Sequence, residues 1–472
     1  MVATYYPDWN VNVLPPQSVQ YKKYDLIYFA FALPTEYAGL EFTQSDSVQT
    51  LKRLVKYAHG NGTKVVLSVG GWSGSKYFSQ VIVNETTRSI FANSIYEVVT
   101  TNNLDGVDID WEYPGQAQVQ DNTVSPQDTE ALLKFFLTLR SRLGAHSIIS
   151  AAVTDSTFLD KSGKRTTNVS GFGEVLDYIL IMNYDVNSES ATPGPNAPFS
   201  DACKDSRQPG ANMISSIKTW TDAGFPREKI LMGLPAYGYI NKSTATTLVH
   251  KRKRSIRTRF QMYSENIGKR ALNLIQGQCS DSPTSCNSPT ASTEENQAGS
   301  ETPPITNISS PAANNDSQIT NPIPTTNITQ SSNSSQSVLA LNSTDSLIGL
   351  DRSSKLSNDS KENGNLDGYP GPQIPFKDLF KWGVLGSGLN DNNANLTGLN
   401  GYKIAWDHCS STPYAYDKSR NTLVTYDDGR SIGIKARFAK TSGIGGVGFW
   451  EITGDHQSML IDSVWKNFGG DS

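Results

Sequence analysis

Three acidic residues with the spacing of a β-strand are the best candidates for chemistry in this sequence. Asp108, Asp110 and Glu112 alternate with three apolar residues. This is the two-residue period of a strand, so the three acids project from one face. Ionised carboxylates are costly to bury without partners and repel one another, so at least one should hold a proton near neutral pH. A proton shared among packed carboxylates predicts general acid/base chemistry.

Two other interpretations of this run are less well supported. A solvent-exposed edge strand would also carry acids, but the apolar neighbours and the terminating Pro114 and Gly115 disfavour it. A metal site is disfavoured because residues two apart on a strand lie about 6.6 Å apart, so the outer acids would struggle to reach one ion. The run also lacks the glycine pattern of a calcium-binding loop. We therefore expect neither a metal nor a cofactor.

The rest of the chain alternates short β-rich runs with helical runs, a pattern typical of a parallel barrel. We predict strands at 2–6, 26–32, 64–72, the acidic run, 147–153, 176–183, 229–235 and 443–451. Helices are predicted at 47–59, 87–100, 126–143, 211–223 and 455–468. The predicted fold class is α/β, a (β/α)8 TIM barrel, whose chemistry belongs at the carboxyl ends of the strands. Glu112 is predicted to lie at such an end.

A long insertion separates the seventh and eighth predicted strands. It has about 200 residues, whereas such connections usually have a few. Its middle is dominated by Ser, Thr, Asn and Pro, a composition that cannot bury enough apolar surface to become ordered. Alternating runs on both sides of this tract indicate a small α+β module. We predict a catalytic barrel in 1–240, an α+β insertion in 241–277 and 366–440, a disordered tract in 278–365, and strand eight with the closing helix in 441–472.

Charge and hydropathy exclude several classes of partner. The net charge of −4 and the isoelectric point near 5.8 give no field that would gather nucleic acid or an anionic membrane. No run of 18 or more apolar residues occurs, so no membrane span is predicted. An uncharged polymer suits this composition, and we expect the chain to act as a monomer.

The distribution of glycosylation acceptors and cysteines bears on the compartment. The chain starts with a predicted strand instead of an apolar leader, yet Asn-x-Ser/Thr acceptors are frequent, which favours an extracellular, secreted glycoprotein. The acceptors are Asn61, Asn84, Asn168, Asn241, Asn307, Asn315, Asn327, Asn333, Asn342, Asn358 and Asn395. The four cysteines show no zinc spacing and allow three pairings. Cys279 with Cys286 is the obvious local loop, which would leave Cys203 with Cys409, but the sequence does not decide between the pairings.

The acidic run resembles the signature of a known enzyme family. Asp105-x-x-Asp108-x-Asp110-x-Glu112 is similar to the DxxDxDxE motif of the family 18 glycoside hydrolases, the chitinases. Three further strand ends match the family: Ser68-x-Gly70-Gly71, Met182-x-Tyr184-Asp185 and Trp450. The flanks of the insertion also resemble the α+β module that lines one side of the cleft in many members. The resemblance covers about residues 1–240 and 366–468.

This resemblance implies hydrolysis of the β-1,4 bonds in chitin or chito-oligosaccharides by substrate-assisted, retaining catalysis. Glu112 would be the general acid/base, Asp110 would orient the substrate acetamide, and Asp108 would share a proton with Asp110. Tyr184 would hydrogen-bond the acetamide oxygen, and Asp185 would help to hold the sugar distorted. Asp105 is expected to make structural hydrogen bonds at the start of the strand. The implied substrate-binding residues are Tyr5, Phe31, Gly71, Trp72, Tyr113, Met182, Tyr237 and Trp450.

Several expectations attached to the resemblance stay open. Many relatives have Tyr-Gly-Arg after strand seven, whereas this chain has Tyr239 in the place of the arginine. Family members also have non-proline cis peptides, expected here at Ala30-Phe31, Glu112-Tyr113 and Trp450-Glu451. Two alternative functions are an endo-β-N-acetylglucosaminidase acting on N-glycan cores, which shares the acidic motif, and a catalytically inactive chitin-binding lectin. Lectins of this type usually lack the terminal glutamate that this chain retains as Glu112.

Overall fold

The computed structural model describes residues 1–116, 121–249, 363–387 and 396–469. All of them belong to one compact unit, which consists of Met1–Asn266 and Asp351–Ser472. The second unit, Ile267–Leu350, lies outside the described residues, as does most of the tract predicted to be disordered. Within the described ranges, every helix is too short or too polar to cross a membrane.

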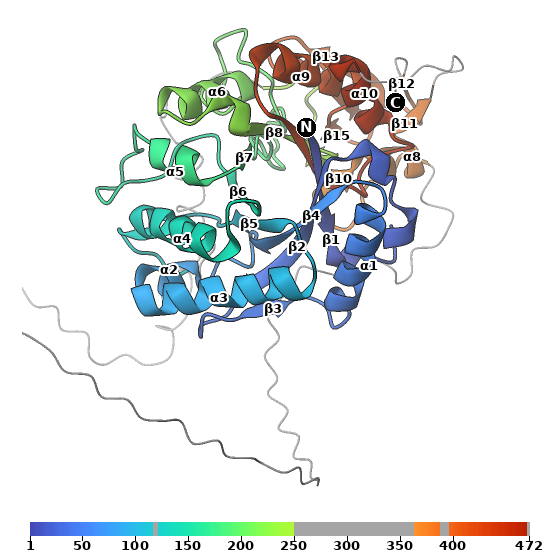
Figure 1. The fold of residues 1–472 in the computed structure, drawn as a ribbon. Helices are drawn as coiled ribbons and strands as arrows, with labels where there is room; N and C mark the ends of the chain where they lie inside the picture. The colour runs from blue at the N-terminus through green and yellow to red at the C-terminus, as the bar shows by residue number, and fades with distance from the viewer. Residues whose placement is uncertain (117–120, 250–362, 388–395, 470–472) are drawn as a thin grey trace, which may run out of the picture. The chain divides into compact units, whose positions relative to one another are not determined.

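A closed ring of eight parallel strands forms the centre of the fold (Figure 1). In their order around the ring, the strands are β1 (Val2–Pro7), β16 (Gly446–Trp450), β8 (Ile230–Pro235), β7 (Tyr178–Ile181), β6 (Ile148–Val153), β5 (Gly106–Asp110), β4 (Lys64–Gly70) and β2 (Leu26–Pro34). Pairing of β1 with β2 closes the ring, and the short β3 (Leu40–Phe42) runs antiparallel to β2. The predicted (β/α)8 barrel is confirmed.

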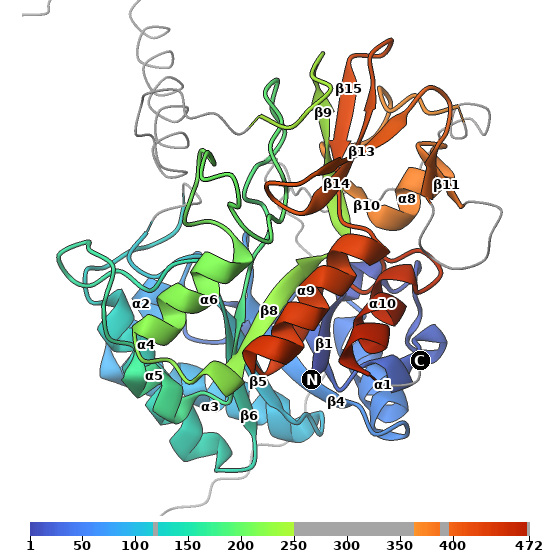
Figure 2. The ribbon, with the colours of Figure 1, turned by 90° about the horizontal axis from the view of Figure 1, so that it is seen from above.

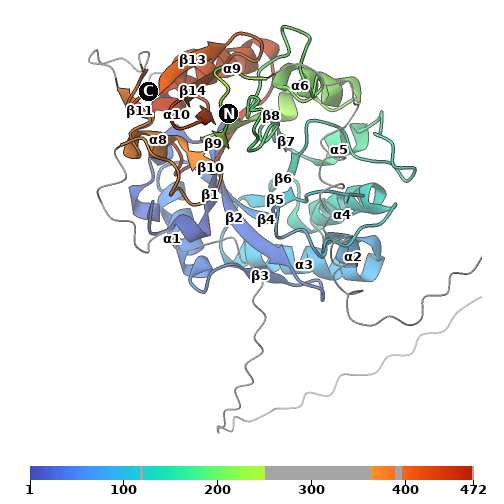
Figure 3. The ribbon, with the colours of Figure 1, turned by 180° about the vertical axis from the view of Figure 1, so that it is seen from behind.

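Helices surround this ring on the outside (Figures 1 and 3). They are α1 (Ser47–His59), α2 (Phe78–Val83), α3 (Glu85–Thr101), α4 (Asp128–Leu143), α5 (Ser170–Val175), α6 (Met213–Asp222), α9 (Gly429–Ser442) and α10 (Met459–Phe468). The closing helix α10 begins four residues later than predicted, because Gln457 and Ser458 have positive φ angles of 51° and 64°. Such angles are incompatible with a right-handed helix.

The alternation in β5 divides its side chains between two apolar layers. Val107 and Ile109 point outward into the core between strands and helices, and Trp111 stacks there on Phe78 with ring centroids 5.3 Å apart. The interior of the barrel has its own smaller apolar cluster, which includes Ala3, Tyr5, Tyr28, Val66, Leu180 and Leu231. Because successive side chains on a strand point to opposite faces, the acids of β5 face this interior.

A second, antiparallel sheet follows β8 (Figure 2). Its strand order is β10 (Gln373–Pro375), β9 (Tyr237–Lys242), β15 (Thr422–Thr425), β14 (Thr412–Asp417) and β13 (Lys403–Asp407). Helix α8 (Phe376–Lys381) and the pair β11 (Leu385–Ser387) and β12 (Leu396–Gly398) complete this region. Helix α9 lies among the barrel helices, where it packs against α10 and β16. The predicted boundaries between barrel and insertion stay a prediction.

The disulfide and the glycosylation acceptors can be placed in part. Cys203 is bonded to Cys409, which joins the segment after β7 to the β13–β14 turn, whereas Cys279 and Cys286 lie outside the described residues. The acceptors Asn61, Asn84 and Asn168 are exposed. Asn241, in contrast, is buried: its side chain accepts the N–H of Ser190 at 2.9 Å and donates to the Tyr239 carbonyl at 3.0 Å. The folded chain therefore does not present Asn241 for modification.

Candidate active site

Asp108 is buried at the centre of a hydrogen-bond cluster inside the barrel. Its Oδ2 accepts from the Tyr5 hydroxyl at 3.1 Å and from Ser68 Oγ at 2.8 Å, and its Oδ1 accepts from Ser150 Oγ at 2.8 Å. These donors come from β1, β4 and β6, so barrel closure brings them together. Burial nevertheless raises the pKa of Asp108 from 3.8 to about 6, and the three hydrogen bonds limit the rise.

Asp110 is buried with an incomplete set of partners. Its Oδ1 is inaccessible and accepts no hydrogen bond from the described residues. Burial, followed by the negative charges of Glu112 and Asp108, raises the pKa of Asp110 well above its ordinary value. Neighbouring buried carboxyls disfavour one another's ionised forms, which is the direction that the sequence pattern predicts.

The raised pKa of Asp108 predicts a pH-dependent contribution to stability. In the unfolded chain this carboxyl ionises near 3.8, and in the folded chain near 6. Its stabilising contribution is therefore complete below about pH 4 and is lost as the pH rises through about 6. The difference corresponds to on the order of 3 kcal/mol. We expect Asp108→Asn to flatten the pH dependence of the free energy of unfolding by this amount, as measured by urea denaturation between pH 4 and 7.

Asp455 has to be separated from this effect, because burial also raises its pKa to about 6. Asp455→Asn serves as the comparison. It should remove the part of the pH dependence of the unfolding free energy that is due to Asp455 and leave the part that is due to Asp108. If the free energy of unfolding depended on pH in the same way in the wild type and in Asp108→Asn, the predicted contribution of Asp108 would be contradicted.

The loop that carries Glu112 is held by polar groups from three other segments. Ser75 Oγ accepts the Glu112 N–H at 2.9 Å, and Asn122 Nδ2 donates to the Glu112 carbonyl at 3.0 Å. Asp128, at the start of α4, accepts the Gly115 N–H at 2.9 Å. The side chain of Glu112 is 9% exposed. Ser75, Asn122 and Asp128 are not singled out by the sequence, because lone polar residues in loops carry no recognisable signal.

All three expected non-proline cis peptides are present, at Ala30-Phe31, Glu112-Tyr113 and Trp450-Glu451. The first acid of the motif, Asp105, accepts the N–H of Val65 at 2.7 Å and contacts His59 Nε2 at 2.8 Å. It therefore ties the start of β5 to neighbouring elements, as expected for a structural residue.

Gly71 lets the β4 end pass close to Phe31. Its φ is +83°, and a Cβ at this position would lie 2.8 Å from the Phe31 ring. Its N–H donates to the Asp110 carbonyl at 2.7 Å, which fixes the end of β4 against β5. Any side chain here would displace the Phe31 ring or the end of β4.

A pair of substitutions separates the effect of this close contact from that of the backbone angle. Gly62 has nearly the same φ, +81°, but a Cβ there would meet nothing within 4 Å. Gly62→Ala should therefore cost about 1 kcal/mol of unfolding free energy, from the left-handed backbone alone. Gly71→Ala should cost a further 1–3 kcal/mol or so from overpacking. If urea denaturation gave the same loss of unfolding free energy for the two variants, the Phe31 ring would move aside without an energetic cost.

Tyr184, Asp185 and Tyr237 meet beside the acids. Tyr184 is buried, and burial followed by the charge of Asp110 raises its pKa well above the ordinary value. The Tyr184 ring lies edge-on to Tyr237 with centroids 6.1 Å apart. Asp185 has a φ of 58°, and its Oδ1 accepts from the hydroxyls of Tyr237 at 2.6 Å and Tyr239 at 2.7 Å. Tyr239, the departure from the family pattern, thus belongs to this cluster.

A line of aromatic rings runs from the barrel interior to the surface. Tyr5 and Trp450 have ring centroids 5.2 Å apart, Trp450 stacks on Phe31 at 5.7 Å, and Phe31 lies 6.2 Å from Trp9. Trp9 follows the end of β1 and is 43% exposed. Trp9 is not among the predicted site residues, although its place just after a predicted strand was a usable signal.

The remaining predicted binding residues also lie at strand ends. Trp72 follows β4 and is 45% exposed. Met182 directly follows β7 and packs against the inner apolar cluster. Tyr113 directly follows Glu112 and lines a small cavity of about 10 Å³ together with Trp111, a space that admits no more than about one water.

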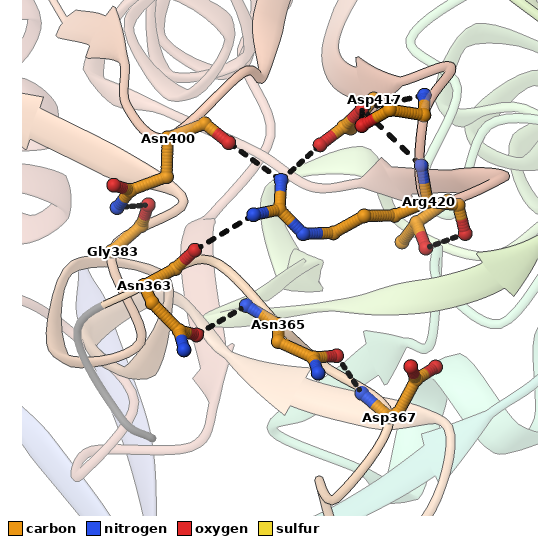
Figure 4. A network of polar contacts seen from close by, with 9 residues as sticks. Asn363, Asn365, Asp367, Gly383, Asn400, Asp417 and Arg420 are labelled. Carbon is orange, nitrogen blue, oxygen red and sulfur yellow. Dashed lines mark hydrogen bonds and ion pairs between the residues drawn. The ribbon is translucent and has the colours of Figure 1, made fainter. Parts of the chain in front are cut away.

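A larger open pocket lies on the second sheet. Its volume is about 460 Å³, and Lys242, Asp367 and Arg420 are among the residues that line it. The charges here are paired: Lys242 with Asp367, and Arg420 with Asp417. The Arg420 guanidinium also donates to the carbonyls of Asn400 at 2.6 Å and Asn363 at 3.0 Å (Figure 4). The charged groups that line the pocket are thus engaged in ion pairs and hydrogen bonds, so we assign no chemistry to this pocket.

The fold and the site define a class of protein: a (β/α)8 barrel with three acids on one inward face of a strand, the last of them just beyond its carboxyl end. Within this class, the chain belongs to the glycosyl hydrolases family 18, whose model matches residues 1–455.

Similar proteins from several organisms agree with this membership. A chitinase-like effector of Moniliophthora roreri is 29% identical over 99% of this chain and 93% of its own length. Chitinase A1 of Niallia circulans is 23% identical over 85% of this chain and 42% of its own length. The crystal structure of a chitinase from Rhizomucor miehei, 24% identical, matches with a TM-score of 0.64 over 99% of both chains. At this identity, the structural likeness shows the fold.

Proposed function

We propose that this chain hydrolyses β-1,4 bonds between N-acetylglucosamine units of chitin or chito-oligosaccharides. The observation that carries the proposal is the arrangement of Asp108, Asp110 and Glu112, in which burial raises the pKa of Asp108 and burial together with the two neighbouring acids raises that of Asp110. A carboxylic acid among like charges is suited to protonating the leaving oxygen of a glycosidic bond. Similar proteins described as chitinases support the choice of substrate.

In the first step, Glu112 donates its proton to the glycosidic oxygen. The acetamide oxygen of the substrate attacks C1 as the C1–O bond breaks, which gives a positively charged oxazolinium intermediate. Asp110 accepts the acetamide N–H and stabilises this positive charge. Its Oδ1, which accepts no hydrogen bond from the described residues, supports this role. Asp108, fixed by three hydroxyl donors, shares a proton with Asp110.

In the second step, Glu112 removes a proton from a water molecule that attacks C1, the bond between C1 and the acetamide oxygen breaks, and the β-configuration is retained. Tyr184 donates to the acetamide oxygen, and Asp185 accepts from a sugar hydroxyl and holds the ring distorted. Trp450 supplies the apolar surface beneath the reacting sugar. Phe31, Trp72 and the other aromatic residues of the strand ends contact the neighbouring sugars.

Secretion belongs to the same proposal. The disulfide between Cys203 and Cys409 and the exposed acceptors Asn61, Asn84 and Asn168 support an extracellular location. Chitin, as an insoluble polymer, would have to be met outside the cell. We propose a monomer, because the proposed site draws its residues from one chain.

A time course with defined chitin oligomers tests the proposed function. We expect shorter oligosaccharides whose reducing ends appear first in the β-anomer, as observed by NMR. Initial products with inverted configuration would refute substrate-assisted catalysis. Turnover of a high-mannose glycoprotein without turnover of chitin oligomers would favour the endo-β-N-acetylglucosaminidase, and saturable binding without any turnover would favour the lectin.

A further inference from the structure

Asp185 carries two phenol hydrogen bonds on a single carboxylate oxygen. Tyr237 and Tyr239 both donate to Oδ1, at 2.6 and 2.7 Å. The two tyrosines are two residues apart on β9, so their side chains leave the strand on the same face. The other oxygen, Oδ2, accepts no hydrogen bond from the described residues. Both phenols therefore hold one oxygen in place and leave the second for an outside donor.

The main chain of Asp185 is fixed from the same side. Its φ of 58° lies in the left-handed region, and its N–H donates to Asn196 Oδ1 at 2.9 Å. The Asn196 amide in turn donates to the Tyr237 carbonyl at 3.1 Å. Hydrogen bonds thus connect both the backbone and the side chain of Asp185 to β9, which belongs to the second sheet.

Tyr239 is itself oriented by the next strand of that sheet. In the antiparallel pairing of β10 with β9, Gln373 lies opposite Tyr239, and Gln373 Nε2 donates to the Tyr239 hydroxyl at 2.8 Å. A phenol oxygen that accepts from an amide directs its own proton elsewhere, here to the carboxylate. Two consecutive hydrogen bonds, from Gln373 to Tyr239 and from Tyr239 to Asp185, therefore connect the second sheet to a residue that the proposed mechanism places against the sugar.

We propose that Tyr239 is a positioning residue that sets the orientation of the Asp185 carboxylate, with Gln373 as its support from the second sheet. This inference rests on the proposed function. Two phenol donors on one oxygen restrict the rotation of the Asp185 carboxylate more than one donor would.

Removing the Tyr239 hydroxyl tests the proposal. We expect Tyr239→Phe to lower kcat on a fluorogenic chito-oligosaccharide about tenfold or more, because hydrogen bonds to charged groups are the strong ones. KM should stay within about twofold, because the substitution leaves the groups that contact the sugar in place. Gln373→Met, at an exposed position, should give a smaller change in the same direction.

Tyr414→Phe is the matched control, since it removes a hydroxyl from the same sheet whose acceptor is the Thr246 carbonyl, away from Asp185. It should leave kcat and KM unchanged. A merely structural role for Tyr239 would reduce the folded fraction and leave kcat per folded molecule at the wild-type value. If Tyr239→Phe matched the wild type in kcat per folded molecule, the proposal would be overturned. If Tyr239→Phe does not fold, Gln373→Met decides by the same criterion.

A structural experiment separates this inference from the proposed function. If the wild type shows no hydrolysis, crystal structures of Glu112→Gln and of Glu112→Gln/Tyr239→Phe, each with and without chitotetraose, give the orientation of the Asp185 carboxylate. A rotated or disordered carboxylate in the double variant supports the role of Tyr239 even when the enzymatic proposal has failed. The same carboxylate orientation in both variants overturns it.

Discussion

Glu112→Gln is expected to reduce hydrolysis of chito-oligosaccharides about 10³-fold, within the range typical of general acid/base groups. The amide cannot donate a proton to the leaving oxygen or take one from water. Its size matches that of the acid, and the main chain at this position is held independently of the side chain by Ser75 and Asn122. Binding of the oligosaccharide should therefore survive, so calorimetry on the inactive variant should still give a saturating isotherm.

Glu97→Gln is the matched control for this experiment. Glu97 is an exposed residue of α3, on the outside of the barrel, and its substitution makes the same chemical change there. It should keep full activity. Turnover by Glu112→Gln comparable to that of Glu97→Gln would remove Glu112 from the mechanism, and with it the proposed roles of Asp108 and Asp110.

Lys435→Met is expected to lower the free energy of unfolding by about 3–5 kcal/mol. Lys435 on α9 pairs with Asp427, and both side chains are 0% exposed. Burial lowers the pKa of Lys435 and raises that of Asp427, since each charge is costly to keep away from water. Asp427 Oδ2 accepts no hydrogen bond from the described residues, so removal of the lysine would leave an unpaired buried carboxylate.

An exposed ion pair provides the comparison. Lys218 and Asp222 lie one turn apart on α6, and their side chains are 71% and 61% exposed. Lys218→Met should change the free energy of unfolding by less than about 0.5 kcal/mol. The double variant Asp427→Leu/Lys435→Met should regain most of the loss, because it removes the unpaired charge. Equal losses for Lys435→Met and Lys218→Met in urea denaturation would contradict this account.

The buried pair also bears on the site. Helix α9 packs against β16, the strand that ends at Trp450. A weakened start of α9 should loosen the position of Trp450 relative to Tyr5 and Phe31. Stability and activity are therefore coupled in Lys435→Met, and its kinetics have to be measured well below its unfolding midpoint.

The elements of the barrel and the acids could be predicted because their signals are local. The two-residue alternation places Asp108 and Asp110 on one face of β5 and predicts the same face for Glu112, just beyond its end, whatever the rest of the chain does. The predicted helix at 47–59 matches α1 at both ends, and the barrel strands were located to within a few residues. Tyr184, Asp185 and Trp450 were predicted in the same way, because a residue at the carboxyl end of a barrel strand lies at the rim that such folds use.

The partners of these residues were decided only by the tertiary structure. Asp108 meets Tyr5, Ser68 and Ser150 because β1, β4 and β6 surround β5 in a closed barrel, and no spacing along the chain encodes those three contacts. The effect of Tyr239 could not be read from the sequence either. Its hydrogen bonds to Asp185 and Gln373 join positions 54 and 134 residues away. Strand periodicity depends on neighbours along the chain, whereas hydrogen-bond partners and the burial that raises a pKa depend on which distant segments pack together.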